Sequence, residues 1–195
     1  MIPYRGILLF VAGLGTSLAA GWIGLPAVLY ERTPQPLQFS HKTHSGTAGM
    51  KCEDCHAVRD DGTFSGIPAL AKCAECHAEP MGTTAAEKQF VEKYVKTNRE
   101  VPWHVYSRQP DNAHFSHANH VKLGKVACET CHGGHGKTET LRPFERNRIS
   151  GYSRDIWGPS LARISSSGRQ GMKMDDCMSC HKERGVSDSC LDCHK

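Results

Sequence analysis

Cysteine and histidine recur in this chain in one pattern. All ten cysteines of the 195 residues fall in five copies of Cys-x-x-Cys-His, numbered here as motifs one to five: Cys52, Cys55 and His56; Cys73, Cys76 and His77; Cys128, Cys131 and His132; Cys177, Cys180 and His181; Cys190, Cys193 and His194. Two thiols of such a motif add to the vinyl groups of a haem, and the histidine binds its iron. Zinc sites and disulfides also use paired cysteines, but neither needs a histidine after every second one. The spacing therefore predicts five covalent haems c.

A duplicated segment supplies candidates for the second axial ligand of each iron. Phe-Ser-His-x-x-His occurs at residues 39–44 and 115–120, and each copy begins thirteen residues before the first cysteine of a motif. Two histidines three positions apart share one helical turn, or serve two haems that lie on either side of it. A repeat at a fixed offset indicates a duplicated haem-binding unit. We therefore predict four distal ligands: His41, His44, His117 and His120.

Three further histidines, His104, His114 and His135, are candidates for the remaining distal position. A methionine near a motif is the alternative, and it would raise the potential of that haem; the candidates are Met81, Met172, Met174 and Met178. Five haems with two histidines each would leave two histidines over. These could hold a sixth haem, although no cysteine remains to tether it.

Composition agrees with haems as the core of the protein. Only 38% of the residues are hydrophobic and 7% aromatic, which is too little for an ordinary large core. We expect a mostly irregular polypeptide with short α-helices wrapped around the haems. The formal charge of +4 becomes about −1 with five oxidised haems and about −6 when they are reduced, because each haem brings two propionates. The basic composition therefore does not indicate a nucleic-acid partner.

Residues 7–29 carry no charge, a length that can span a bilayer, and Tyr4 and Tyr30 bracket them as interfacial anchors. A cleaved signal peptide is the alternative, with Ser17-Leu18-Ala19 resembling a cleavage site, but apolar residues continue ten positions beyond it. We expect a transmembrane anchor at 1–30, a linker at 31–38 and a haem domain at 39–195, with haem units starting near 39 and 115. Covalent haem attachment places that domain in the periplasm, on the outer side of the bacterial inner membrane.

Two segments between the motifs have sequence patterns that indicate their structure or role. Thr84 and Glu87 predict a capping box that opens a helix, with an apolar stripe at Phe90, Val91, Tyr94 and Val95 and an end near Asn98. Residues 137–173 hold no haem motif and are rich in arginine, glycine and serine. That stretch is either a solvated loop or a docking surface for a partner or for propionates.

The segment Phe39-Ser40-His41-Lys42-Thr43-His44 resembles the repeat of class III multihaem cytochromes. The resemblance implies that His41 binds the haem of Cys52 and Cys55, and that His117 binds the haem of Cys128 and Cys131. His44 and His120 would cross to other haems.

A wider set of segments is similar to the membrane-anchored multihaem cytochrome of alternative complex III and of the related menaquinone reductase complex: residues 64–68, 101–103, 110–111 and 131–133. The resemblance implies an electron-carrier subunit with no catalysis of its own. Its implied partners are a molybdopterin-enzyme-like subunit, an iron–sulfur subunit, a quinone-binding integral membrane subunit and a soluble periplasmic cytochrome c.

Two other functions are weighed against the electron carrier. A self-sufficient quinol dehydrogenase has a haem motif close to its anchor and a methionine ligand after it; here Ala57-Val58 follows the first motif, about twenty residues beyond the anchor. A catalytic multihaem reductase needs an iron with an open position. Seven spare histidines for five irons argue against that reading.

Overall fold

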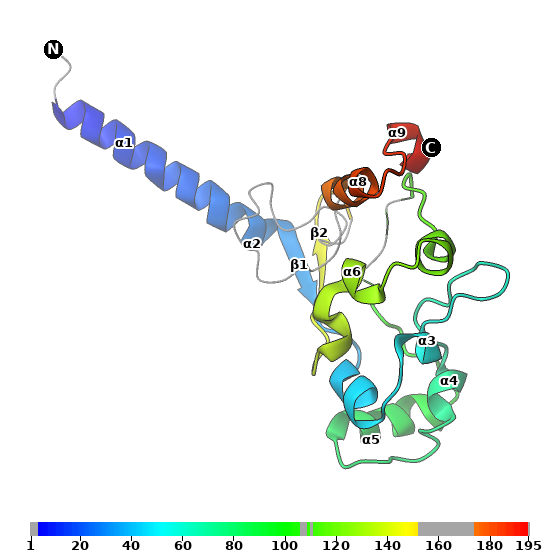
Figure 1. Cartoon of the computed structure of the whole chain (residues 1–195). Helices are drawn as coiled ribbons and strands as arrows, with labels where there is room; N and C mark the ends of the chain where they lie inside the picture. The colour runs from blue at the N-terminus through cyan, green and yellow to red at the C-terminus, as the bar shows by residue number, and fades with distance from the viewer. Residues whose placement is uncertain (1–3, 106–108, 110, 152–173, 195) are drawn as a thin grey trace.

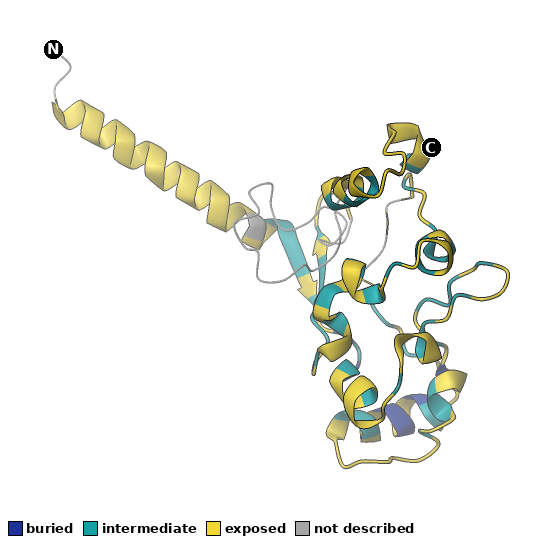
Figure 2. Ribbon diagram, viewed as in Figure 1, coloured by how far each residue is buried: buried dark blue, intermediate teal, exposed yellow. Residues whose placement is uncertain are grey.

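A long N-terminal helix projects from the rest of the molecule (Figures 1 and 2). The computed structural model describes residues 4–105, 109, 111–151 and 174–194. The helix runs through α1 (Tyr4–Ala19), the π-helical turn η1 (Ala20–Gly24) and α2 (Leu25–Leu29). Its 26 residues are long and apolar enough to cross a membrane, a test that a signal sequence near the N-terminus also passes. At 1.5 Å per residue it is about 39 Å long, against about 30 Å for a bilayer core.

A two-stranded antiparallel sheet follows this helix. Strand β1 (Tyr30–Thr33) pairs with β2 (Phe144–Asn147), and the register sets Glu31 opposite Arg146 and Arg32 opposite Glu145. Both pairs form salt bridges, of 3.1 Å and 2.7 Å. The sheet was not expected from the sequence, and it holds the start of the 31–38 segment against the haem domain.

The remaining described elements are short helical segments, in agreement with the expected fold. Each cysteine motif lies on or at the end of one of them: α3 (Cys52–Cys55), α4 (Leu70–Ala74), α6 (Cys128–His132), α8 (Met174–Glu183) and α9 (Cys190–Cys193). The others are α5 (Ala85–Phe90), the π-helical turns η2 (Thr43–Thr47), η3 (Val91–Val95) and η4 (Ala118–Leu123), and the 3₁₀ segment η5 (Gly133–Lys137). Residues 152–173, the C-terminal part of the arginine-rich stretch at 137–173, lie outside the described residues.

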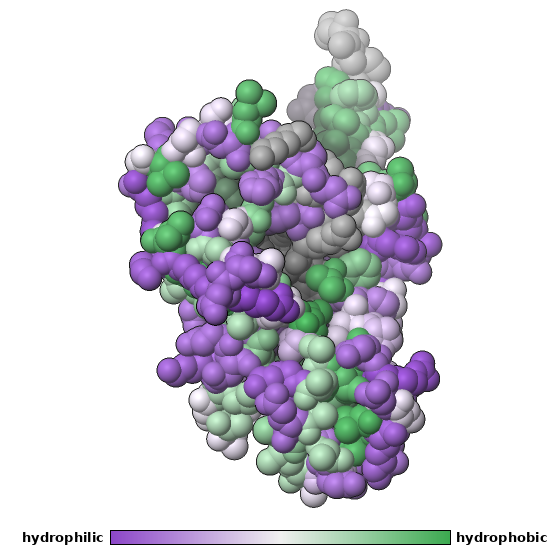
Figure 3. Space-filling view, turned by 90° about the vertical axis from the view of Figure 1, so that its right-hand side faces the viewer, coloured by the Kyte–Doolittle hydropathy of each residue, from purple (hydrophilic) through white to green (hydrophobic). Residues whose placement is uncertain are grey.

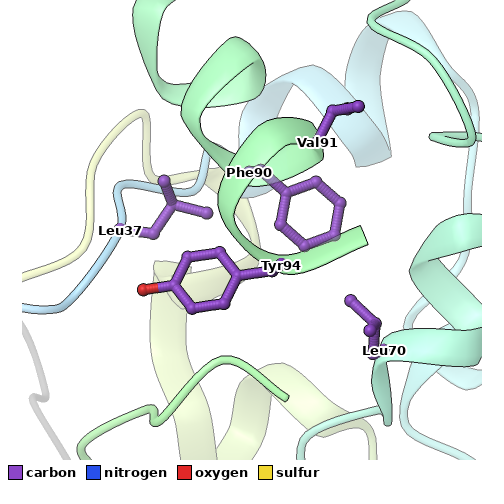
Figure 4. Packing of buried hydrophobic residues seen from close by; sticks show 5 residues of the cluster. All are labelled: Leu37, Leu70, Phe90, Val91 and Tyr94. Carbon is purple, nitrogen blue, oxygen red and sulfur yellow. The ribbon is translucent and has the colours of Figure 1, made fainter. Parts of the chain in front are cut away.

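The hydrophobic core of the described residues is small (Figure 4). It contains five buried side chains: Leu37, Leu70, Phe90, Val91 and Tyr94. Three of them belong to the helix predicted from the sequence, and that prediction is confirmed over Ala85–Val95. Hydrophilic residues cover much of the face in Figure 3, and hydrophobic residues gather on the projecting helix. So small a core is too little to order the domain by itself.

The helix of the core begins and ends at the residues expected. The Thr84 side chain accepts a hydrogen bond from the Glu87 N–H, and Asn98 adopts a left-handed conformation (φ 49°) after the last turn. The Glu87 carboxylate differs from the expectation. A capping box would turn it back to the Thr84 N–H, but it accepts from the N–H groups of Met81 and Gly82.

Candidate haem-binding sites

Three proximal histidines are held through the same ring nitrogen. Nδ1 of His56 lies 2.7 Å from the Gly66 carbonyl oxygen, and Nδ1 of His181 lies 2.8 Å from that of Ser187. Nδ1 of His77 lies 3.0 Å from the Glu87 carboxylate. In this arrangement Nδ1 donates its hydrogen, which leaves Nε2 as the nitrogen that can bind a metal.

The two Phe-Ser-His-x-x-His segments adopt the same local contacts. The phenylalanine stacks on the second histidine, with ring centroids 4.3 Å apart for Phe39–His44 and 4.5 Å for Phe115–His120. It meets the first histidine edge-on, at 4.8 Å in both copies. Nδ1 of the second histidine lies 2.8 Å from the serine carbonyl oxygen in both copies, so Nε2 is again the nitrogen left for a ligand role.

Three of the repeat histidines lie near a motif histidine, at ring separations within about 0.2 Å of those expected for two imidazoles on one iron. A bond from a metal to imidazole is about 2.0–2.1 Å, and the ring centre lies about 1.1 Å further, so two imidazoles on one metal have centroids about 6.2–6.4 Å apart. The measured separations are 6.0 Å for His44–His77, 6.4 Å for His117–His132 and 6.0 Å for His120–His181.

His41 lies in a cluster of imidazoles beside motif one. Burial lowers the pKa of His41 to about 4, helped by His135, His56 and His44. Its Nδ1 is buried, and no described group lies within hydrogen-bond distance of it. The His41 and His135 centroids are 4.7 Å apart, too close for one iron between them. His41 thus sits near His56 with a ring nitrogen that the protein leaves unpaired.

The three remaining candidates occupy different places. The His114 N–H donates to the Cys193 carbonyl oxygen over 2.7 Å, so His114 lies beside motif five. The His104 ring stacks on Phe144 at 5.7 Å. Of the methionine candidates, Met81, Met174 and Met178 are exposed, and Met172 lies outside the described residues.

The thiols of different motifs lie close together. None of the ten cysteines, all of which the structure describes, forms a disulfide, as attachment to haem requires. Burial raises the pKa of the Cys52 thiol, and a hydrogen bond with Cys128 raises it further. Burial likewise raises the pKa of Cys177, with further contributions from Cys131 and Cys193. Motif one therefore adjoins motif three, and motif four adjoins motifs three and five.

Motifs one and two are neighbours as well, and a cavity lies beside them. Burial raises the pKa of Cys73, and the Cys55 thiol raises it further. A cavity of about 700 Å³ is lined by Cys55 and by Ile67, Val101 and Trp103, with Lys72 at its edge. Apolar walls suit a porphyrin face, and a cation suits a propionate.

These residues fit haem. Pairs of imidazoles lie about one iron apart, the thiols form no disulfides, the buried Nδ1 of His41 has no hydrogen-bond partner among the described residues, and the described core is too small without a large apolar group. A model of the class III cytochrome C family matches residues 25–104. The chain is 38% identical to the menaquinone reductase multiheme cytochrome c subunit of Nitratidesulfovibrio vulgaris, over 95% of this chain and 89% of that protein.

The chain belongs to this family of multihaem cytochrome c subunits. It is an electron-carrier subunit rather than a catalytic one, with a class III cytochrome domain that is mostly helical and irregular. The resemblance noted in the sequence is confirmed.

Two contacts of these sites were not foreseen. Phe64 stacks on His117 with centroids 3.8 Å apart and lies 6.3 Å from the ring of His56, so it joins the two haem units. Glu87 was expected only as a helix cap, and its carboxylate bonds the ring of His77. The spacing of ten residues between a motif histidine and a glutamate offers no recognisable signal in the sequence.

Proposed function

We propose that this chain holds five haems c in one row and relays electrons along it, between a soluble periplasmic redox protein and a membrane-bound quinone-reducing complex. Haem supplies the chemistry when bound, because its iron gains and loses one electron. The cysteines tether each haem, and paired histidines occupy both axial positions, which leaves no position for a substrate. The observation that carries the proposal is the separation of 6.0–6.4 Å between three pairs of opposed imidazoles.

The proposed axial pairs follow from these contacts. His44 serves His77, His117 serves His132 and His120 serves His181, as their ring separations favour. His41 serves His56, its electrostatic neighbour. His114 serves His194, because its backbone is bonded to Cys193. The pairing leaves His104 and His135 without a haem.

The order of the haems in the row is two, one, three, four, five. Shared histidine segments join haems one and two, and haems three and four. The Cys52–Cys128 hydrogen bond supports haems one and three as neighbours, and the contribution of the Cys193 thiol to the raised pKa of Cys177 supports haems four and five as neighbours. In Figure 1 the motif helices follow the same order from α4 at the bottom, through α3 and α6, to α8 and α9 at the top.

The ends of the row would face different partners. In Figure 1, α8 and α9 lie at the upper end of the domain, at the height of the projecting N-terminal helix, whereas α4 and α5 lie at the lower end. If the N-terminal helix spans the bacterial inner membrane, haems four and five lie nearer the membrane partners, and haem two faces the periplasm. The similar protein of Nitratidesulfovibrio vulgaris is named as a subunit of menaquinone reductase, which supports a multisubunit partner. We infer partners of the kinds that the resemblance implies: molybdopterin-enzyme-like, iron–sulfur and integral membrane subunits.

The proposal is tested on the full-length protein purified from membranes. A pyridine haemochrome assay should give five haems per polypeptide, and the oxidised protein should show only low-spin iron by electron paramagnetic resonance. Copurification should recover the partner subunits, and the chain alone should not oxidise quinol. A major high-spin fraction would contradict saturated ligation, and robust quinol oxidation by the chain alone would favour a self-sufficient dehydrogenase.

A further inference from the structure

Glu87 approaches the proximal histidine of motif two as a charged hydrogen-bond partner. Its Oε1 lies 3.0 Å from His77 Nδ1, and both side chains are largely buried, with exposed fractions of 14% and 22%. The Nδ1 atoms of four other histidines lie within hydrogen-bond distance of neutral backbone carbonyls instead: His56 to Gly66, His181 to Ser187, His44 to Ser40 and His120 to Ser116. His77 thus forms a hydrogen bond with a charged carboxylate, whereas these four histidines bond to uncharged carbonyl groups.

The carboxylate is fixed in place and held ionised. The Met81 and Gly82 N–H groups each donate to it over 2.8 Å, one to each oxygen. Hydrogen bonds from N–H donors to both oxygens favour the ionised form of the carboxylate. Glu87 also sits in the first turn of α5, and Phe90 of α5 and Val91 of the following η3 are buried in the core. A carboxylate held on a core helix can exert a constant effect on the ring.

We propose that Glu87 lowers the reduction potential of haem two through its hydrogen bond to His77. A hydrogen bond to a carboxylate draws the Nδ1 hydrogen away from the imidazole and increases the basicity of Nε2. A more basic, more anionic ligand stabilises ferric iron over ferrous iron, and the nearby negative charge acts in the same sense. Glu87 is therefore a positioning and tuning residue, since it acts on the iron through His77.

A low potential at haem two would favour electron flow in one direction along the row. Haem two is the terminal haem of the proposed order, so a low potential there would make it a reluctant electron acceptor and a strong donor to haem one. Electrons that enter at this end would then move inward rather than remain on the surface. The inference depends on the proposed function in one respect, because it assumes a haem at motif two with His77 as a ligand.

The test compares potentials in the purified, haem-loaded full-length protein. Glu87→Gln keeps the shape of the side chain and an oxygen that can accept from His77, but removes the charge. Potentiometric titration of the visible spectrum should then show one haem component at a higher potential and four unchanged. Loss of such a partner commonly changes the affinity or activity of a metal site tenfold or more. A tenfold change in the one-electron equilibrium of haem two would raise its potential by about 59 mV.

Three further variants separate tuning from folding. Thr84→Ala removes the cap of the same helix but leaves the carboxylate on His77; it should lower the thermal midpoint and leave all potentials unchanged. Glu87→Asp should restore part of the shift. His44→Met, on the opposite face of the same iron, should move the same component.

Each outcome decides the inference. Unchanged potentials in Glu87→Gln would overturn it, and so would loss of one haem, because Glu87 would then be needed for haem attachment. A shift in Thr84→Ala equal to that in Glu87→Gln would assign the effect to the fold. If the unaltered protein lacks a low-spin haem at motif two, the proposed function fails instead, so the two failures are distinguishable.

Discussion

Replacement of His44 by alanine should open one axial position and no other. The His44 ring faces His77 at 6.0 Å, so its removal leaves the iron of motif two with a single protein ligand. One haem in five should become high-spin in the oxidised protein. Electron paramagnetic resonance, with spin counting against the pyridine haemochrome total, measures that fraction directly.

The cost to stability can be worked out from the contacts of the ring. His44 stacks on Phe39 at 4.3 Å, a contact worth about 0.5–1.5 kcal/mol. Its Nδ1 bonds the Ser40 carbonyl over 2.8 Å, which adds about 0.5–1.5 kcal/mol. Before any loss of the axial bond, His44→Ala should therefore lower the free energy of unfolding by about 2 kcal/mol, a decrease visible in the thermal midpoint.

A matched control uses a histidine outside the proposed pairs. His104 also stacks on a phenylalanine, Phe144, at 5.7 Å, but it faces no proximal histidine in the proposed pairing. His104→Ala should keep all five haems low-spin. If His44→Ala retained five low-spin haems, or if His104→Ala produced the high-spin fraction, the use of ring separations to assign ligands would be wrong.

Three further outcomes are expected. His114→Ala should give one high-spin haem of five, whereas His135→Ala should give none; the reverse result would reassign the fifth ligand. Tyr94 is 2% exposed, so Tyr94→Ala should cost about 3–5 kcal/mol of unfolding free energy in thermal or denaturant unfolding, and a cost below 1 kcal/mol would contradict its place in the core. Arg32→Glu sets two carboxylates opposite each other and should cost about 0.2–1 kcal/mol, restored by adding Glu145→Arg; no recovery in the double variant would count against the pairing of β1 with β2.

Local patterns in the sequence predicted the helix of the core. Thr84, the apolar stripe and Asn98 lie within one short stretch, and each acts on its immediate neighbours, so their spacing carries the structure. The family could also be recognised from the sequence, because the residues of each motif lie close together in the chain. The ligand assignments remain predictions, now supported by ring separations.

Contacts between distant segments could not be predicted in the same way. Glu31 and Arg146 are 115 positions apart, and each strand has only four residues, so neither shows the alternation that marks a strand. One signal was present: Tyr-Glu-Arg-Thr and Phe-Glu-Arg-Asn are self-complementary when they run antiparallel, because each glutamate meets an arginine. The contact between Glu87 and His77 was missed for a different reason. The pattern identified Glu87 as a helix cap, and the backbone N–H of Glu87 alone forms the bond to Thr84.

Duplication of the Phe-Ser-His-x-x-His unit explains how a row of haems could arise. In the proposed pairing, each unit offers one histidine to its own haem and a second, three residues on and stacked on a phenylalanine, to another. One copy would therefore link two haems, and two copies would give two pairs of haems. A further contact is needed to connect the two pairs. Phe64, stacked on His117 and adjacent to His56, lies at that junction, as does the Cys52–Cys128 contact. The fifth haem needs no further unit, because its motif begins nine residues after the histidine of motif four and the Ala113–His194 bridge brings the second unit alongside it.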